Sequence, residues 1–265
     1  MIRQTRILRG SGVQWQTLLY NFCAMTCTMM KPVLFALCVS LMLLSGGCDS
    51  CYSSRATPAV ELTAEPSHHF ALQNEYVRIF KVEVAPHAST LLHRHGHDYI
   101  FVTLGDADLT NAVADQPPAE LKLKDGEVRF SAAPLVHRAI NNGATPFRNV
   151  TVELLQPNRS YKPTEEDRGL EVGHGAMQET LFVQDGVKAS DVTINPGQML
   201  HRQTYLRPHL VVAVSALELE SEPADGAARA IHAQPGDVEW VAAGVTQSLM
   251  NTGMKPGRFI MLEFE

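Results

Sequence analysis

Hydrophobic and polar residues alternate with a period of two along most of the chain beyond residue 70. The alternation or a β-branched run is visible in "YVRIFKVEV", "DYIFVTL", "VTVELL", "LVVAVSALEL" and "RFIMLEF", which Gly, Pro, Asn and Asp turns separate. A period of two places the apolar side chains on one face of a strand. No segment shows a sustained helical period. The pattern therefore predicts an all-β chain of antiparallel strands, in a sandwich or a closed barrel.

Three blocks of sequence recur in the same order further along the chain. "NEYVRIFKVEVAP" (74–86) is similar to "QDGVKASDVTINP" (184–196), and "DGEVRFSAAPLVHRAINNG" (125–143) is similar to "PGDVEWVAAGVTQSLMNTG" (235–253), both at an offset of 110. Between them, "LLHRH" (91–95) matches "MLHRQ" (199–203) at an offset of 108, which implies a loop shorter by two residues in the second copy. These matches predict two tandem copies of one β-rich module.

The first 47 residues differ from the rest, because they hold four basic residues, no acidic residue and most of the long apolar runs. "KPVLFALCVSLMLLSGGC" has the layout of a secretory signal, with a lysine, an apolar core of twelve residues and small residues before Cys48. That core is shorter than the about 20 residues that span a bilayer. The segment resembles a bacterial lipoprotein signal, which implies lipid on Cys48, although Ser45 stands where that family prefers leucine. Cleavage and release without lipid is the alternative.

The predicted organisation of the chain follows from these two observations. It comprises a signal peptide (1–47, of which 1–28 is interpreted as a mis-assigned start), a tether (48–66), an N-terminal module (67–160), a linker (161–179) and a C-terminal module (180–265).

Charge and cysteine placement narrow the class of protein. The chain has 22 basic and 28 acidic residues, and without residues 1–47 the balance becomes 18 against 28, a net charge of −10. A basic surface for nucleic acid is therefore excluded. All five cysteines lie at or before Cys51, so neither module has a disulfide framework or a thiolate metal site.

The stretch "LHRHGHDYIFV" carries the candidate chemistry. His93 and His95 lie two residues apart on a predicted strand and face the same side. If Gly96 and His97 form a two-residue turn, Asp98 begins the next strand beside the two imidazoles and supplies an oxygen ligand. If the strand instead runs straight through Gly96, His97 replaces Asp98 as the ligand. We prefer the turn and keep the second alternative open.

His137 is the candidate for the fourth ligand, since it ends another predicted strand. With these residues in view, both modules resemble cupin domains. His93, His95 and Gly105 match the first cupin motif, with Asp98 near the place of its glutamate. Gly126, His137 and Asn141 match the second motif, with Ala132 and Pro134 in place of its proline and glycine. The resemblance implies two double-stranded β-helix (jelly-roll) barrels and a metal held in the first.

A ligand set of imidazoles with at most one carboxylate suits one divalent transition metal, Mn, Fe, Ni, Cu or Zn, and disfavours Ca and Mg. The remaining histidines are interpreted as solvated surface residues: His68, His69, His87, His174 and His232. Tyr99, Arg129 and Arg138 are neighbours of the site whose facing the sequence leaves undetermined.

The second module has lost the metal ligands at the positions that the repeat aligns with the first. The residues at these positions are His201, Gln203, Pro208 or His209, and Gln247. Glutamine is a poor ligand for a transition metal. We expect a structural copy, with one alternative in which His201, Arg202, Gln203 and Gln247 line a polar pocket for an organic ligand.

Two hypotheses for the function remain at this point. One is a metal-dependent enzyme, an oxygenase, isomerase or hydrolase, acting on a small polar compound. The other is a non-catalytic periplasmic lipoprotein that binds a metal or a small molecule. Arginines facing into the first barrel would favour the enzyme, and apolar packing up to the metal would favour the structural role. A homodimer is left open.

The signal predicts where the protein resides. We expect Cys48 to carry lipid and to hold the chain at the periplasmic face of the inner membrane, with the tether leaving the modules free in solution. Cys48→Ser should then move the protein to the soluble periplasmic fraction or leave it as unprocessed precursor, whereas Cys51→Ser should change nothing. Normal processing and unchanged membrane fractionation of Cys48→Ser would contradict the prediction.

Overall fold

The computed structural model describes residues 58–156, 170–173 and 175–265. The predicted signal peptide, Cys48 and His174 lie outside these residues, as does most of the predicted linker. The described strands all belong to one compact unit, which ends at Glu265. No helix among the described residues is long and apolar enough to cross a membrane.

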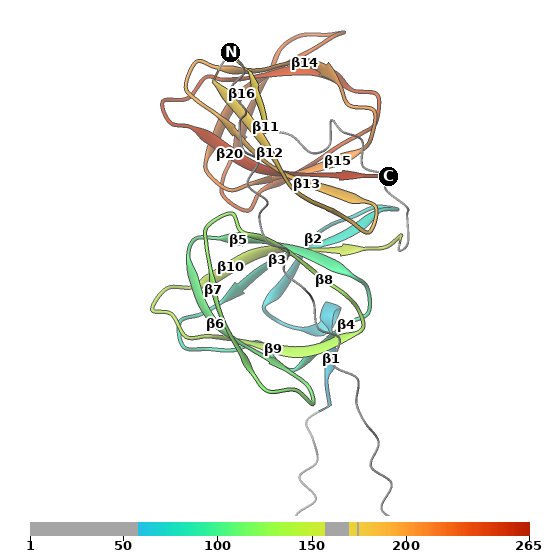
Figure 1. Cartoon of the computed structure of the whole chain (residues 1–265), viewed down its shortest axis with the longest axis vertical. Coiled ribbons are helices and arrows are strands. Elements are labelled where there is room, and N and C mark those ends of the chain that lie inside the picture. Colours follow the sequence, from blue (N-terminus) through green and yellow to red (C-terminus); the bar gives the residue numbers. More distant parts are fainter. Residues whose placement is uncertain (1–57, 157–169, 174) are drawn as a thin grey trace, which may run out of the picture. The chain divides into compact units, whose positions relative to one another are not determined.

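The first half of this unit is a barrel of two five-stranded sheets, ordered β1-β4-β9-β6-β7 and β2-β3-β10-β5-β8. Its elements, in cyan to green in Figure 1, are β1 Val60–Glu61, the short 3₁₀ helix η1 Leu62–Ala64, β2 His68–Gln73, β3 Val77–Val84, β4 His93–His95, β5 Tyr99–Leu104, β6 Ala107–Val113, β7 Ala119–Leu123, β8 Val128–Ser131, β9 Leu135–Asn141 and β10 Phe147–Leu154.

The second half repeats the barrel with a six-stranded sheet, β11-β12-β13-β20-β15-β18, and a four-stranded sheet, β14-β19-β16-β17. Its strands, in yellow to red in Figure 1, are β11 Leu170–Gly173, β12 Ala176–Gln184, β13 Val187–Ile194, β14 Met199–Thr204, β15 His209–Ala213, β16 Leu217–Pro223, β17 Arg229–Ala233, β18 Val238–Val241, β19 Thr246–Asn251 and β20 Gly257–Phe264. The predicted all-β fold with two tandem jelly-roll barrels is confirmed.

Two predicted boundaries need correction. β1 and η1 lie inside the segment predicted as a tether, where Leu62 and Glu65 are each 2% exposed. β11 and the start of β12 lie inside the segment predicted as a linker. In both places β-strand pairing, which the sequence pattern did not indicate, extends the barrel toward the N-terminus.

The repeat is more regular than the sequence predicted. Ser89 forms a bridge with Ile140 and His93 pairs with His137, while Met199 pairs with Met250 and Gln203 with Gln247. Each pair in the second barrel is therefore displaced by 110 residues from its counterpart. The offset of 108 for "MLHRQ" was wrong, because the strand register places Gln203, not His201, opposite the counterpart of His137.

One hydrophobic cluster draws buried side chains from both barrels. It lies between the sheet β2-β3-β10-β5-β8 and the sheet β11-β12-β13-β20-β15-β18, here called the two large sheets. Because side chains alternate along a strand, one face of each large sheet points into its own barrel and the other face points to this cluster. The first barrel supplies eight residues (Val77, Ile79, Ile100, Val102, Leu104, Val150, Val152, Leu154) and the second supplies eight (Val187, Ala189, Leu210, Val212, Val214, Ile260, Leu262, Phe264).

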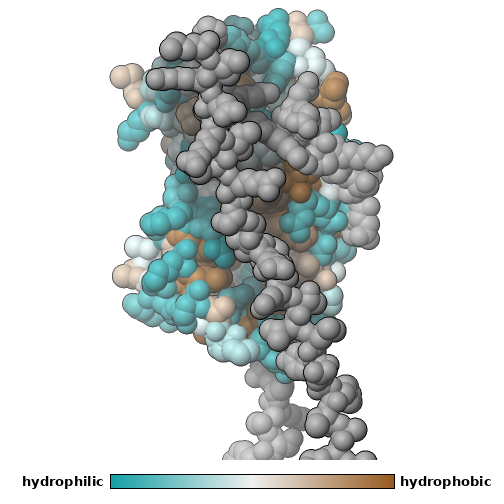
Figure 2. Space-filling model, in the orientation of Figure 1, coloured by the Kyte–Doolittle hydropathy of each residue, from teal (hydrophilic) through white to brown (hydrophobic). Residues whose placement is uncertain are grey.

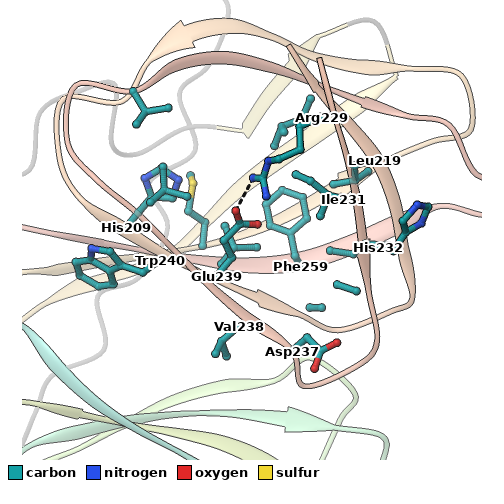
Figure 3. Close-up of a pocket in the computed structure, with 18 of the residues that line it drawn as sticks. His209, Leu219, Arg229, Ile231, His232, Asp237, Val238, Glu239, Trp240 and Phe259 are labelled. Carbon is teal, nitrogen blue, oxygen red and sulfur yellow. Dashed lines mark hydrogen bonds and ion pairs between the residues drawn. The ribbon is translucent and has the colours of Figure 1, made fainter. Parts of the chain in front are cut away.

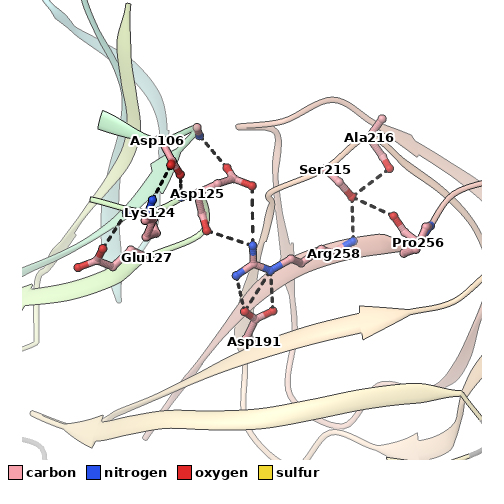
Figure 4. A network of polar contacts seen from close by, with 10 residues as sticks. Asp106, Lys124, Asp125, Glu127, Asp191, Ser215, Ala216, Pro256 and Arg258 are labelled. Carbon is pink, nitrogen blue, oxygen red and sulfur yellow. Dashed lines mark hydrogen bonds and ion pairs between the residues drawn. The ribbon is translucent and has the colours of Figure 1, made fainter. Parts of the chain in front are cut away.

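Polar contacts connect the same two barrels beside the cluster. Arg258 of β20 donates to the Asp191 carboxylate at 2.6 Å and to the backbone carbonyl of Asp125 at 3.0 Å (Figure 4). The guanidinium lies directly over Gly126, whose φ is +72° and where a Cβ atom would come within 2.6 Å of Arg258 Nη2. Glycine is therefore needed there for both backbone conformation and close approach. Outside these contacts, the visible surface is mostly hydrophilic with small hydrophobic patches (Figure 2).

The shared cluster predicts cooperative unfolding of the two barrels. Leu210→Ala removes a fully buried side chain from the cluster and should lower the free energy of unfolding by about 2–5 kcal/mol. Urea denaturation should show one transition, shifted in this variant. Leu206→Ala is the control, since this side chain is 84% exposed, and it should change stability by less than about 0.5 kcal/mol. Two separate transitions, with only one shifted, would contradict a shared core.

Candidate metal centre

Three of the predicted ligands meet inside the first barrel. His93 and His95 lie on β4 and point the same way, and His137 lies on β9 directly opposite His93. The three side chains are buried, with 1%, 1% and 9% of each residue exposed. The Nε2 atom of His95 is 3.2 Å from Nε2 of His93 and 3.2 Å from Nε2 of His137.

The opposite ring nitrogens fix the direction of the lone pairs. His93 Nδ1 donates to the Leu91 carbonyl at 2.9 Å, and His137 Nδ1 donates to Asn111 Oδ1 at 2.7 Å. Both acceptors lack a hydrogen, so the proton of each neutral ring is on Nδ1 and Nε2 carries the lone pair. These contacts are of the kind that orient metal-ligating histidines.

A fourth imidazole, which the sequence analysis assigned to the surface, completes the group. The His68 side chain is 5% exposed, and its ring centroid is 4.9 Å from that of His93. One ligand atom each from His68, His93 and His95 lie within 4.8 Å of one another. The surface interpretation of His68 was wrong because β2 pairs with β3 and turns this side chain into the barrel. Neither cupin motif includes β2, so the only sequence signal for His68 as a ligand was that it is a histidine.

Glu65 holds His68 in place from a buried position. Its Oε2 accepts from His68 Nδ1 at 2.6 Å, and its Oε1 accepts from the Leu91 N–H at 3.0 Å. Burial alone would raise the pKa of this carboxyl, but the hydrogen bonds from His68 and Leu91 outweigh it and keep the pKa below its usual value. Glu65 is therefore ionised and can offset part of the charge of a cation in the barrel.

Burial keeps the central imidazoles unprotonated. Together with the neighbouring histidines, burial lowers the pKa of His95 to about 2 and that of His137 to about 3. Burial also lowers the pKa of His93. At neutral pH the rings therefore present lone pairs, the form that binds a metal.

The spacing of these nitrogens fits a transition metal. Imidazole nitrogens about 2.0–2.1 Å from a tetrahedral ion lie about 3.3 Å from one another, close to the observed 3.2 Å. Without a cation, lone pairs would face one another in a buried site, which is unfavourable. Manganese, iron, nickel, copper and zinc all accept such ligands.

Asp98 and His97 are not brought into this group. The Asp98 carboxylate accepts from the Ala133 N–H at 2.6 Å, and neither side chain lines the pocket at the histidines. β4 ends at His95 and β5, in the other sheet, begins at Tyr99. The chain therefore crosses between sheets instead of forming a hairpin, and neither alternative for the non-histidine ligand places its residue among the imidazoles.

Of the expected neighbours, Tyr99 alone contacts the described site. Its ring stacks on His95 with centroids 4.0 Å apart, and burial raises the pKa of its hydroxyl. Arg129 pairs with Glu127 at 2.7 Å, and neither Arg129 nor Arg138 lines the pocket.

The pocket at the histidines is small and holds no Lys, Arg, Asp or Glu among its described lining residues. Its volume is about 70 Å³, room for only a few water-sized molecules. Apolar side chains of Val82, Phe101, Leu109, Leu121 and Phe147 form much of its wall, beside hydroxyl and amide groups of Thr90, Thr110, Asn111, Asn149 and Thr151.

In the second barrel, the register changes the set of equivalent positions. Gln178, Gln203, Tyr205 and Gln247 occupy the places of His68, His93, His95 and His137. His201 and Arg202 are exposed, so the predicted polar pocket retains only Gln247, which accepts from Ser221 at 2.7 Å. No described residue cluster there offers three imidazoles or carboxylates to a metal.

Comparison with solved structures agrees with this architecture. Oxalate decarboxylase of Bacillus subtilis, in a structure concerned with its Mn(II) centres, is similar at 14% identity over 76% of each chain, with a TM-score of 0.54. AerE from Microcystis aeruginosa is similar at 13% identity over 76% of this chain and 98% of the other, with a TM-score of 0.51. No protein-family model and no curated protein matches the sequence. At such low identity the likeness establishes the fold, which is that of the cupin proteins.

Ligand substitutions test the assignment of the four histidines. We expect one divalent transition ion per chain, lost in His137→Ala and bound at least tenfold more weakly in His68→Ala and in Glu65→Gln. Asp98→Asn and His97→Ala should retain the metal, because neither side chain reaches the imidazoles. Elemental analysis and thermal unfolding with and without added ion would measure this. Loss of metal in Asp98→Asn with full retention in His68→Ala would contradict the assignment.

Proposed function

We propose that this chain is a metal-dependent enzyme of the cupin fold, whose first barrel acts on a very small uncharged molecule. The observation that carries the proposal is the convergence of four imidazoles at the wall of a pocket of about 70 Å³. A divalent ion bound there would supply Lewis-acid or redox chemistry at its open coordination position.

The residues around the pocket support a small neutral substrate. Phe101, Leu109 and Phe147 contribute apolar side chains to its wall, and the nearby Thr110 and Asn149 offer uncharged hydrogen-bonding groups. A dianion such as oxalate would find no arginine or lysine among the described lining residues. We therefore do not propose oxalate as the substrate of this chain.

A non-catalytic metal protein is the second candidate, and the apolar wall of the same pocket favours it. In that case all coordination positions would be filled by protein side chains. The location also stays a proposal: the sequence of residues 31–48 supports export and a lipid anchor at Cys48.

A diatomic probe separates the two candidates. The protein would first be loaded with manganese, because a structural neighbour has Mn(II) centres. A second sample would be loaded with iron(II) and exposed to nitric oxide, whose binding at an open coordination position is detected by electron paramagnetic resonance. We expect nitric oxide to bind and oxalate not to bind. Ala139→Leu, which narrows the pocket at a lining residue that is not one of the four imidazoles, should keep its iron and lose most nitric oxide binding. Consumption of dioxygen by the iron(II) or manganese(II) form would then be measured.

The outcomes differ clearly. Iron-loaded protein that never binds nitric oxide would establish a closed structural site and contradict the enzyme. Tight oxalate binding at the metal would contradict the neutral substrate.

A further inference from the structure

The second barrel encloses a cavity of about 1000 Å³, against about 70 Å³ at the metal centre (Figure 3). The interior of a small barrel is normally filled by its own side chains. The edge strand β18 lines the cavity, together with His69, Phe70 and Lys81 of the first barrel. A volume of this size is typical of sites for small organic molecules.

Substitutions at equivalent positions explain part of the space. Phe80, Phe101 and Phe147 pack in the interior of the first barrel. The register places Ser190, Val211 and Gly257 at the corresponding positions of the second barrel. Three aromatic rings of the first barrel are therefore absent from the second, and of the residues that replace them Val211 lines the cavity.

One part of the cavity wall carries apolar residues where the first barrel has polar ones. Asn149 and Thr151 line the pocket of the first barrel, and Phe259 and Met261 line the cavity at the equivalent positions. Further apolar side chains continue this wall: Val211, Leu217, Leu219, Ile231 and Leu249. Such a surface gains most from contact with an apolar molecule, because water is displaced from it.

Charged groups at the cavity are neutralised in pairs. Arg229 binds Glu239 at 2.6 Å, beside the Phe259 ring in Figure 3, and Lys81 binds Asp237 at 2.8 Å. All four side chains are partly exposed to solvent. Within the described lining, these pairs leave no Lys, Arg, Asp or Glu without its counterion, so the cavity does not favour a ligand of either charge.

The cavity wall also holds polar side chains that can form a hydrogen bond with an uncharged group of a ligand. Tyr205 and His209 stack with ring centroids 4.3 Å apart and line the cavity together with Gln247. Burial lowers the pKa of His209 and raises that of Tyr205, so both are neutral near pH 7.

We propose that the second barrel binds a neutral, mostly apolar small molecule that carries one uncharged hydrogen-bonding group. This site is separate from the metal centre and goes beyond the function proposed for it. The barrel that the sequence analysis treated as a structural copy thereby has a binding role of its own.

The neutral fluorophore N-phenyl-1-naphthylamine is a suitable probe, because its emission rises in apolar surroundings. In a Trp15→Phe background, Trp240, which lines the cavity, is the remaining tryptophan of the chain's two. We expect saturable binding of about one probe per chain, with energy transfer from Trp240. Val211→Phe with Ala233→Leu, which restores the residues of the first barrel, should weaken binding at least tenfold, and Ala233→Leu alone should weaken it less. Leu206→Phe, at an exposed position, is the matched control and should bind normally.

Metal content and thermal unfolding of each variant show whether it is folded, since the metal centre lies in the other barrel. Unchanged probe binding in the folded double variant would overturn the proposal. Tighter binding of the anionic 8-anilinonaphthalene-1-sulfonate than of the neutral probe would overturn the ligand class. Loss of metal from His137→Ala with normal probe binding would support independence of the two sites.

Discussion

The register of the antiparallel strands is the constraint on which both barrels depend. Val84 pairs with Phe147 in one barrel and Ile194 pairs with Gly257 in the other, so the two ladders superpose residue by residue. A slip by one residue would exchange the inward and outward faces of a strand. The shared hydrophobic cluster, the metal centre and the cavity all require that this exchange does not occur.

Burial of four imidazoles is costly unless their polar atoms have partners. The structure meets this cost at His68, His93 and His137 with Glu65, the Leu91 carbonyl and Asn111. His95 is the exception, because its Nδ1 has no partner among the described residues while its Nε2 faces two other rings. Its stacked neighbour Tyr99 supplies packing only, so a cation at Nε2 would stabilise this ring more than the others.

The sequence was sufficient for the features that local pattern determines. Period-two alternation predicted the β fold, and the spacing of His93 and His95 predicted that they face the same side. His137 was added because it ends a predicted strand and matches the second cupin motif. Asp98 was misplaced because alternation cannot tell a hairpin from a crossover between sheets. His68 was missed because its ligand geometry depends on a strand pairing that no motif covers. The offset of 108 failed for a similar reason: both barrels contain the same irregularity before the ligand strand, so the resemblance of "HR" at 93–94 and 201–202 did not reflect equivalent positions.

The two barrels show how one backbone supports opposite interiors. The antiparallel ladders keep the same register. Side-chain exchanges nevertheless give the first barrel a nearly filled interior with imidazoles and the second a larger cavity with apolar residues along part of its wall. Because the outward face of each large sheet is held by the shared cluster, inward-facing residues can change without loss of the common core. The shared hydrophobic cluster therefore stabilises both barrels. The interior of each barrel can then differ from the other in volume and chemistry.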